Sequence, residues 1–217
     1  MLLDDGIDFK GVFSLKEYDI NDNLIGEYSE KNLIMDGART NMAQLVGGVN
    51  TGGTAAGLAI NKLVLGTRGH RGTNILDFQK VGEVDNTKPT GNRSFDSGRT
   101  RLFSEAISGQ INYRITFNAA GGSDVTVNAN GRRYSGNIAQ GSNQAGNTVR
   151  RVVNDRTVTY TITIPVTNAN SGVISDPIVP YTEAALYAGD EIFSMKTFPA
   201  RVKEDTVKFE ISWSIIF

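Results

Sequence analysis

The chain has no cysteine, and it has only one histidine and one tryptophan in 217 residues. Without cysteine it can form neither disulfides nor thiolate metal sites, and it lacks a cysteine nucleophile. The single histidine, His70, has no carboxylate cluster beside it for a metal site and no neighbouring serine and acid for a catalytic triad. We therefore expect a non-enzymatic protein with no cofactor, no metal site and no small-molecule substrate.

Long apolar runs and a strong net charge are also missing. No run of about 18 apolar residues is present, and residues 1–6 lack the basic and apolar stretches of a signal peptide. The formal net charge is −1, so no overall field favours nucleic acid or an anionic membrane. The basic pairs at 132–133 and 150–151 are weak evidence for nucleic acid, because Tyr134 is the one aromatic between them. We expect no membrane and no sequence-specific nucleic acid among the partners.

Alternating apolar and polar residues are the strongest positive signal in the chain. In residues 207–217 the apolar set falls on one side of an extended chain: Val207, Phe209, Ile211, Trp213, Ile215 and Phe217. This period of two predicts a strand with one buried face, central in a sheet. Similar patterns predict strands at 11–18, 111–117 and 158–166, and the run 58–67 predicts a buried strand. We expect residues 191–217 to form a β-hairpin.

Residues 19–23 are typical of a tight turn, because Asp and Asn tolerate left-handed backbone conformations. An acidic calcium loop is the alternative, but the central glycine and the closing glutamate of such a loop are missing. Residues 36–47 form the clearest helical pattern, with Asp36 as the cap and Gly47 at the end. Residues 68–72, which include His70, are expected to be a solvated loop tip.

These elements together predict one mainly β domain over residues 1–217. We expect an antiparallel two-sheet sandwich or jelly-roll-like fold with one short α-helix and long loops. Two long polar insertions interrupt the strand pattern, at about 83–101 and 131–147.

The two insertions contain few apolar residues, so a lone subunit has little burial to offset an ordering cost of about 1–2 kcal/mol per residue. We therefore expect neighbouring subunits to hold them. Arginine pairs well with carboxylates across interfaces, because its planar group donates two parallel hydrogen bonds. The expected subunit contacts are Arg93, Arg99, Arg132 and Arg133.

Several short motifs occur in a recognisable order. The series is Asn-Leu-Ile at 32–34, a small-residue helix at 38–46, Leu-Val-Leu-Gly-Thr at 63–67, Glu-Ala-Ala-Leu-Tyr at 183–187, Phe-Ser-Met-Lys-Thr-Phe-Pro at 193–199 and the alternating strand ending at 217. This series resembles structural proteins of tailed bacteriophages, of the neck or collar, tail or capsid-surface type. A related pattern occurs in attachment domains of tail-fibre proteins. The resemblance covers residues 32–67 and 183–217, and it does not extend to residues 83–150.

The resemblance implies a virion structural protein that oligomerises and connects or decorates other virion proteins, at the neck or collar or the tail. Its partners would be other copies of itself and other virion proteins, and it would be assembled in the cytoplasm of the bacterial host. A capsid decoration protein and a receptor- or carbohydrate-binding fibre module are the alternatives. The motifs are fold-forming and carry no catalytic group.

Overall fold

The computed structural model describes residues 9–47, 59–106, 112–116, 126–127, 133–137, 146–170 and 180–217. These residues are mainly antiparallel β-structure, as the sequence predicts, with the helix α1 (Asp36–Val46) and the 3-10 turn η2 (Ser104–Ala106). The strands are β1 (Lys10–Tyr18), β2 (Leu24–Ile34), β3 (Ile60–Gly66), β4 (His70–Arg71), β5 (Asn74–Phe78), β6 (Asn112–Thr116), β7 (Thr126–Val127), β8 (Arg133–Asn137), β9 (Thr148–Asn154), β10 (Thr157–Ile164), β11 (Tyr181–Ala188), β12 (Glu191–Arg201) and β13 (Lys208–Ile216).

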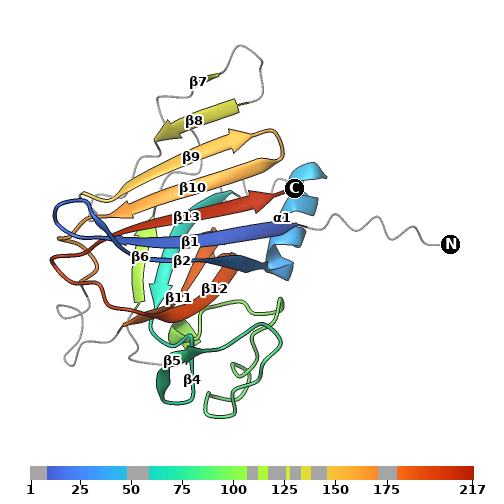
Figure 1. Ribbon diagram of the computed structural model, residues 1–217. Coiled ribbons are helices and arrows are strands. Elements are labelled where there is room, and N and C mark those ends of the chain that lie inside the picture. Colours follow the sequence, from blue (N-terminus) through green and yellow to red (C-terminus); the bar gives the residue numbers. More distant parts are fainter. Residues whose placement is uncertain are drawn as a thin grey trace.

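One curled sheet contains eleven of these strands, in the order β6-β3-β11-β12-β2-β1-β13-β10-β9-β8-β7, and β4 and β5 form a small second sheet. Strand β2 pairs with β1 along most of its length and with β12 through only two residue pairs. It therefore joins the two halves of the sheet, which lie one behind the other in Figure 1. The two separate sheets of the expected sandwich or jelly roll are not confirmed, because β2 makes the sheet continuous.

Strand β13 is central, as its alternation predicts, with β1 on one side and β10 on the other. The main core fills the space between the two halves of the curled sheet. There Phe13 of β1 lies against Trp213 of β13, with ring centroids 5.0 Å apart. Phe13 also stacks on Phe198 of β12 at 5.3 Å. The contact between Phe13 and Phe198 links the two halves of the sheet across the core.

The expected hairpin at residues 191–217 is wrong. Strand β12 pairs with β11 and β2, whereas β13 pairs with β1 and β10. The difference has a physical cause in burial. Residues 192–198 of β12 are buried on both faces, whereas β13 is fully buried on one face only. Strand β12 therefore lies where both of its faces are covered, on the opposite side of the core from β13.

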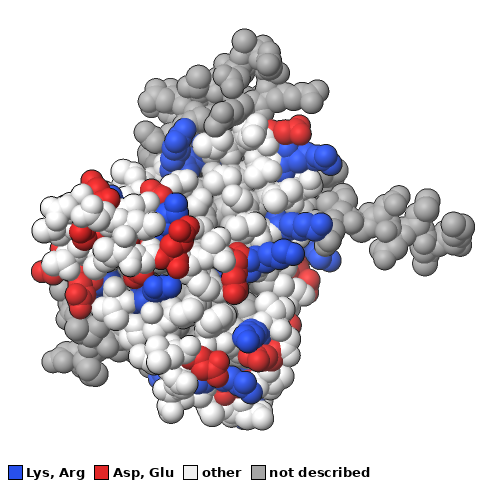
Figure 2. Space-filling view, viewed as in Figure 1, with Lys and Arg blue, Asp and Glu red and all other residues white. Residues whose placement is uncertain are grey.

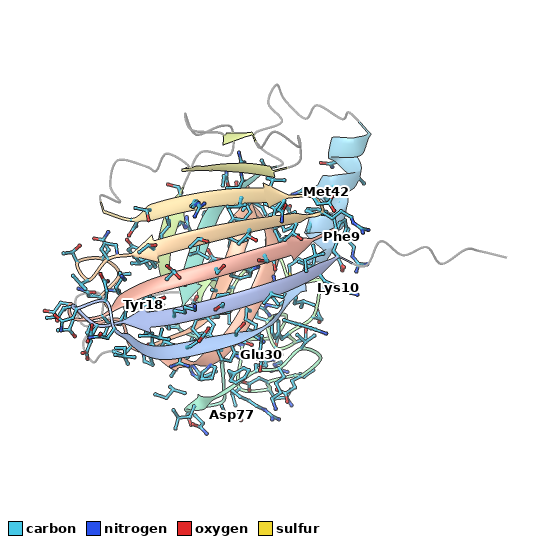
Figure 3. The ribbon with its side chains drawn as sticks, turned by 45° about the horizontal axis from the view of Figure 1, so that its top comes forward. Phe9, Lys10, Tyr18, Glu30, Met42 and Asp77 are labelled. Carbon is cyan, nitrogen blue, oxygen red and sulfur yellow. The ribbon has the colours of Figure 1, made fainter. Side chains whose placement is uncertain are left out.

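The predicted turn at residues 19–23 closes the β1–β2 hairpin. The Asp19 carboxylate accepts hydrogen bonds from the backbone amides of Asn21 (2.8 Å) and Asn23 (2.9 Å) and from the Asn23 side chain. Asp22 has a positive φ of 63°, which the turn requires. Figure 3 labels Tyr18 next to this turn, at the opposite end of β1 from Phe9 and Lys10. The turn is thus fixed by its own side chains.

Helix α1 has the bounds that the sequence predicts. It ends where the amide of Gly47 bonds to the carbonyl of Ala43. Its start is joined to a distant segment, because the Asp36 amide donates to the Ser97 carbonyl at 2.9 Å. Ala38 is fully buried in the main core, which fixes the side of the helix that faces the sheet.

Residues 67–106, here called the 67–106 segment, run from the end of β3 through β4 and β5 to η2 and lie beside β11 and β12 (Figure 1). A second apolar cluster includes Phe95 and Phe103 from this segment together with Ala185 and Met195 from the sheet. The expectation that residues 83–101 need a neighbour to hold them is wrong. Phe95 is buried in this cluster, and the polar contacts described below hold the rest.

The second expected insertion, residues 131–147, lies mostly outside the described residues. Within it, residues 133–137 form strand β8, which pairs with β9 from Arg133 opposite Asn154 to Asn137 opposite Arg150. This part of the insertion therefore extends the sheet.

The outward face of β1, β13 and β10 carries small polar side chains. Ser14 pairs with Ser212, which in turn pairs with Thr161. Figure 2 shows few charges over the middle of this face. Among the described residues, no helix has both the length and the apolar character needed to cross a membrane.

We expect Trp213→Ala to lower the free energy of unfolding by about 3–5 kcal/mol, because Trp213 is fully buried and its loss leaves a cavity. Urea titration followed by circular dichroism measures this change. Ser212→Ala, on the outward face of the same strand, is the control and should change stability by less than about 0.5 kcal/mol. A native tryptophan emission maximum typical of full hydration would contradict the core placement.

Candidate functional site

The two ends of the 67–106 segment meet at one buried carboxylate. Glu183 of β11 is fully buried, and its Oε1 accepts hydrogen bonds from the backbone amides of Ser104 (2.8 Å) and Arg68 (3.2 Å). Its Oε2 accepts one from the amide of Phe103 (2.8 Å). We call these contacts the Glu183 anchor. One side chain of the sheet therefore holds both ends of the 67–106 segment.

Burial raises the pKa of Glu183, and the amide hydrogen bonds from Ser104, Phe103 and Arg68 act in the opposite direction. A buried carboxyl group is costly unless its oxygens are satisfied, and both oxygens of Glu183 have donors. Removing the carboxyl would leave the buried amides of Phe103 and Ser104 and the part-buried amide of Arg68 without this partner.

The anchor depends on glycine at two positions. A Cβ atom on Gly66 would lie 2.2 Å from Ser104 Oγ and 2.6 Å from Glu183 Oε1. A Cβ atom on Gly69 would lie 2.2 Å from the carbonyl oxygen of Thr182. The Gly69 amide uses this close approach to donate to Thr182 Oγ1 at 2.9 Å. Any larger residue would push the 67–106 segment away from β11.

Glu105 fastens the far end of the segment. Its carboxylate accepts hydrogen bonds from the Leu102 amide (3.1 Å), from the Tyr187 hydroxyl and from the Arg114 guanidinium (3.1 Å). Tyr187 belongs to β11 and Arg114 to β6, so Glu105 connects η2 to two strands. Burial and the neighbouring Glu105 carboxylate both raise the pKa of Tyr187, which keeps its hydroxyl protonated as a donor.

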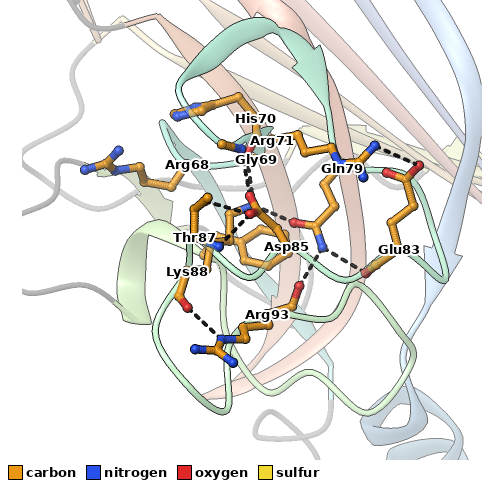
Figure 4. Close-up of polar contacts among 12 residues, drawn as sticks. Arg68, Gly69, His70, Arg71, Gln79, Glu83, Asp85, Thr87, Lys88 and Arg93 are labelled. Carbon is orange, nitrogen blue, oxygen red and sulfur yellow. Dashed lines mark hydrogen bonds and ion pairs between the residues drawn. The ribbon is translucent and has the colours of Figure 1, made fainter.

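Lys88 is the centre of a second group of polar contacts within the segment (Figure 4). Its ammonium group donates to the His70 carbonyl at 2.9 Å and to Gln79 Oε1, and it forms an ion pair with Asp85 at 3.6 Å. It also lies 3.8 Å from the ring centroid of Phe103. We call Lys88, Asp85 and Gln79 the Lys88 network. Burial lowers the pKa of Lys88 to about 8, although Asp85 acts in the opposite direction.

Asp85 and Gln79 spread the network along the segment. Asp85 accepts hydrogen bonds from the amide and hydroxyl of Thr87 and from the Gly72 amide. Burial acts to raise the pKa of Asp85, but these hydrogen bonds lower it to about 2. The Gln79 side chain donates to the Arg93 carbonyl at 2.7 Å.

Gln79 also ties the network to the sheet. The Thr197 hydroxyl of β12 donates to the Gln79 carbonyl at 2.5 Å. The backbone amide of Gln79 donates a hydrogen bond to the backbone carbonyl of Gly69 at 2.9 Å, near the start of the segment. Gln79 therefore connects the Lys88 network to β12 and to Gly69, which directly follows Arg68 of the Glu183 anchor.

The expectation that His70 lies on a solvated loop tip is wrong, because His70 is buried in β4. Burial, together with the positive charges of Arg68 and Lys88, lowers the pKa of His70. The imidazole is therefore neutral at pH 7. The turn is buried because the Glu183 anchor and Thr182 draw residues 68–69 onto β11.

Two of the four expected interface arginines have partners in their own chain. Arg93 donates to the Lys88 carbonyl at 3.0 Å. Arg99 donates to the Ser94 carbonyl at 2.8 Å, and its guanidinium lies 3.7 Å from the ring centroid of Phe103. Both side chains are partly buried, and they fold the segment on itself. Their role as subunit contacts stays a prediction.

The other two expected contacts are not placed by their side chains. Arg132 lies outside the described residues, and Arg133 is described only by its backbone, as the first residue of β8. Of the four expected contacts, the structure thus describes the side chains of Arg93 and Arg99, and both belong to the 67–106 segment.

The chemistry of this region is that of an anchor. Lys88 and Glu183 are buried, and the contacts given above engage their charged ends with groups of the same chain. Within the described ranges, no group of three or more His, Asp or Glu side chains is arranged to hold a metal ion. What the region can do is hold the 67–106 segment in one conformation against the sheet.

Sequence reasoning did not identify the anchor, although two signals for it are present. Glu183 is a charged residue in an otherwise apolar run, and Gly66 closes a buried strand. A charge in a strand that is buried along its whole length indicates a specific buried partner. The partners themselves are backbone amides, which no side-chain pattern reveals.

Comparisons with known proteins add no relative. No family model, no curated protein and no solved structure matches this chain.

We expect Gly66→Ala to destabilise the protein by about 1–3 kcal/mol, because the new methyl group overlaps Ser104 and the Glu183 carboxylate. Gly98→Ala is the matched control, since its nearest neighbour would lie at an ordinary 3.4 Å. Thermal and urea unfolding measure both variants. Equal stability of the two would show that the close approach at Gly66 does not exist.

Lys88 gives the stability a defined pH dependence. Its pKa falls from 10.5 to about 8 on folding, so between these values the unfolded chain binds more protons than the folded one. The free energy of unfolding should then rise with pH in this range. Lys203 shifts in the same direction, so the comparison is made with Lys88→Met.

We expect the difference in unfolding free energy, wild type minus Lys88→Met, to increase from about pH 8 to pH 10.5. Urea titrations at several pH values measure it. A difference that is constant or decreases over this range would mean that Lys88 is not buried in its charged form at neutral pH.

Proposed function

We propose that this chain is a non-enzymatic structural protein of a tailed-bacteriophage virion. It oligomerises and connects or decorates other virion proteins, and its position is the neck or collar, or the tail. The resemblance in residues 32–67 and 183–217 supports this proposal. The resembling motifs at 63–67, 183–187 and 193–199 lie on the neighbouring strands β3, β11 and β12, where they serve the architecture.

One observation carries the proposal further, namely the kind of apolar side chain that is exposed. Among the described residues the exposed large apolar side chains are all aliphatic: Val12, Ile20, Leu24, Ile25, Ile75, Leu76, Val81, Val84, Val202 and Ile216. Leu76 is 74% and Ile20 is 68% exposed, and both are on turns or short strands held by their own hydrogen bonds. Exposed aliphatic side chains on ordered loops favour contacts between proteins.

The same observation separates the proposal from one of its two alternatives, the fibre module. A carbohydrate-binding fibre module presents aromatic rings on which sugars stack, and the exposed apolar set of the described residues contains none. A capsid decoration protein also binds through protein contacts, so it stays as a second position for the same type of protein.

The proposal includes the finer description of the fold. The two halves of the curled sheet enclose the core that contains Phe13 and Phe198, which supports grouping the fold with two-layer β-sandwiches and jelly-roll-like virion domains.

We expect the protein to be present, in a fixed copy number, in tailed particles purified from the bacterium that carries its gene. Quantitative mass spectrometry of gradient-purified particles measures this number, and immunogold labelling locates the protein at the neck or tail. Particles that form normally, infect and lack the protein would overturn the proposal.

A further inference from the structure

Strand β2 has one edge that is paired along the strand and one that is not. The paired edge lies against β1 from Leu24 to Asn32, whereas β12 reaches the other edge only at Leu33 and Ile34. Among the described residues, no strand pairs with that second edge before Leu33, and no hydrogen bond outside the β1–β2 ladder involves the backbone of residues 25–31. In Figure 1, β2 is the lowest strand of the front layer. We call the unpaired side of residues 26–32 the β2 edge.

The β2 edge is accessible and already extended. Glu27, Ser29, Glu30 and Lys31 are exposed. A strand edge presents a row of N–H and C=O groups that can bond to a strand of another chain. Because β1 holds β2 in place, adding a strand would cost β2 little conformational entropy. The side chains then decide which strand fits.

The side chains of the β2 edge are complementary to a second copy of the same edge. Glu27, Ser29 and Lys31 alternate along the outward face of the sheet. When two copies pair antiparallel with Ser29 opposite Ser29, Glu27 of each copy lies directly opposite Lys31 of the other. Opposite charges in opposed positions stabilise a pair of strands. Lys16 of the same chain lies 3.9 Å from Glu27 on the β1 side, so each Glu27 would lie between two lysines.

The charges also select this register over its neighbours. A shift by one residue would place Glu27 opposite Glu30 and outward residues opposite inward ones. Moving the axis from Ser29 to Glu30 would place Glu30 opposite itself. Like charges in opposed positions destabilise strand pairing. The register centred on Ser29 avoids both, and it leaves Leu33 and Ile34 paired with β12.

We infer that two copies of this chain associate through an antiparallel β2–β2 pair centred on Ser29, and this inference rests on the oligomerising role in the proposed function. The sheet of one copy then continues into the sheet of the other. Both copies contribute the same residues, so the contact is isologous and closes as a two-fold dimer. Strands without matching charges are disfavoured at this edge, which makes the contact specific.

Charge reversal tests the contact. Glu27→Lys or Lys31→Glu alone places like charges opposite each other twice, so we expect dimerisation in sedimentation equilibrium to weaken by about tenfold or more. In an equimolar mixture of the two variants, both opposed pairs of the mixed dimer again join opposite charges, so heterodimers should form as tightly as the wild-type dimer. Glu204→Lys reverses an exposed charge away from the β2 edge and should dimerise like wild type. Trp213 fluorescence and thermal unfolding verify that each variant is folded.

The absence of cysteine makes a second test specific to the register. In the inferred dimer the two Ser29 residues are directly opposed, at a Cα separation that a disulfide can bridge. Ser29→Cys should therefore form covalent dimers rapidly under mild oxidation. Thr148→Cys, exposed at the start of β9, is the control and should link far more slowly.

Three results would each overturn the inference: a wild-type protein that is monomeric at all concentrations, a mixture of charge variants that does not dimerise, or linking of Ser29→Cys no faster than the control. The contact and the virion role fail separately. Incorporation into particles without β2 pairing refutes only the contact, and β2 pairing without incorporation refutes only the virion role.

Discussion

The hydrogen bonds between the buried Glu183 carboxylate and three backbone amides are the interaction on which the conformation of the 67–106 segment depends. The carboxylate bonds to backbone amides at both ends of the 67–106 segment, so one residue of β11 fixes where the segment leaves the sheet and where it returns. Placing a carboxyl group in the interior is costly, and the cost is offset only while the amides are in place. The segment and the strand therefore hold each other, and Gly66 provides the space in which they meet.

This arrangement explains how a polar segment can be ordered with few apolar residues. Phe95 and Phe103 belong to a small apolar cluster. Elsewhere in the segment, side chains of the Lys88 network donate hydrogen bonds to backbone carbonyl groups, such as those of His70 and Arg93. Apolar side chains such as Leu76 can then remain on the surface, because the segment does not need them for its own folding. An ordered loop with unused aliphatic side chains is suited to contacts with other proteins.

The sequence predicted the elements better than their partners. Strand β13, helix α1 and the turn at 19–23 were predictable because their signals, alternation and capping, are local. Alternation gives the buried face of a strand but not its neighbour, so the 191–217 hairpin was wrong. The anchor was not predictable for a related reason. Arg68, Phe103 and Glu183 meet through backbone amides far apart in the chain, and His70 is buried as a consequence.

Amide hydrogen exchange on Glu183→Ala, compared with wild type, tests the anchor most directly. The account predicts that peptides from 67–78 and 99–106 exchange much faster in the variant, while peptides from β1 and β13 keep their protection, since only the anchor is lost. Unchanged protection of the 67–106 segment in a folded Glu183→Ala protein would show that the carboxylate does not hold it. Loss of protection throughout the chain would show that Glu183 supports the whole core and not this segment alone.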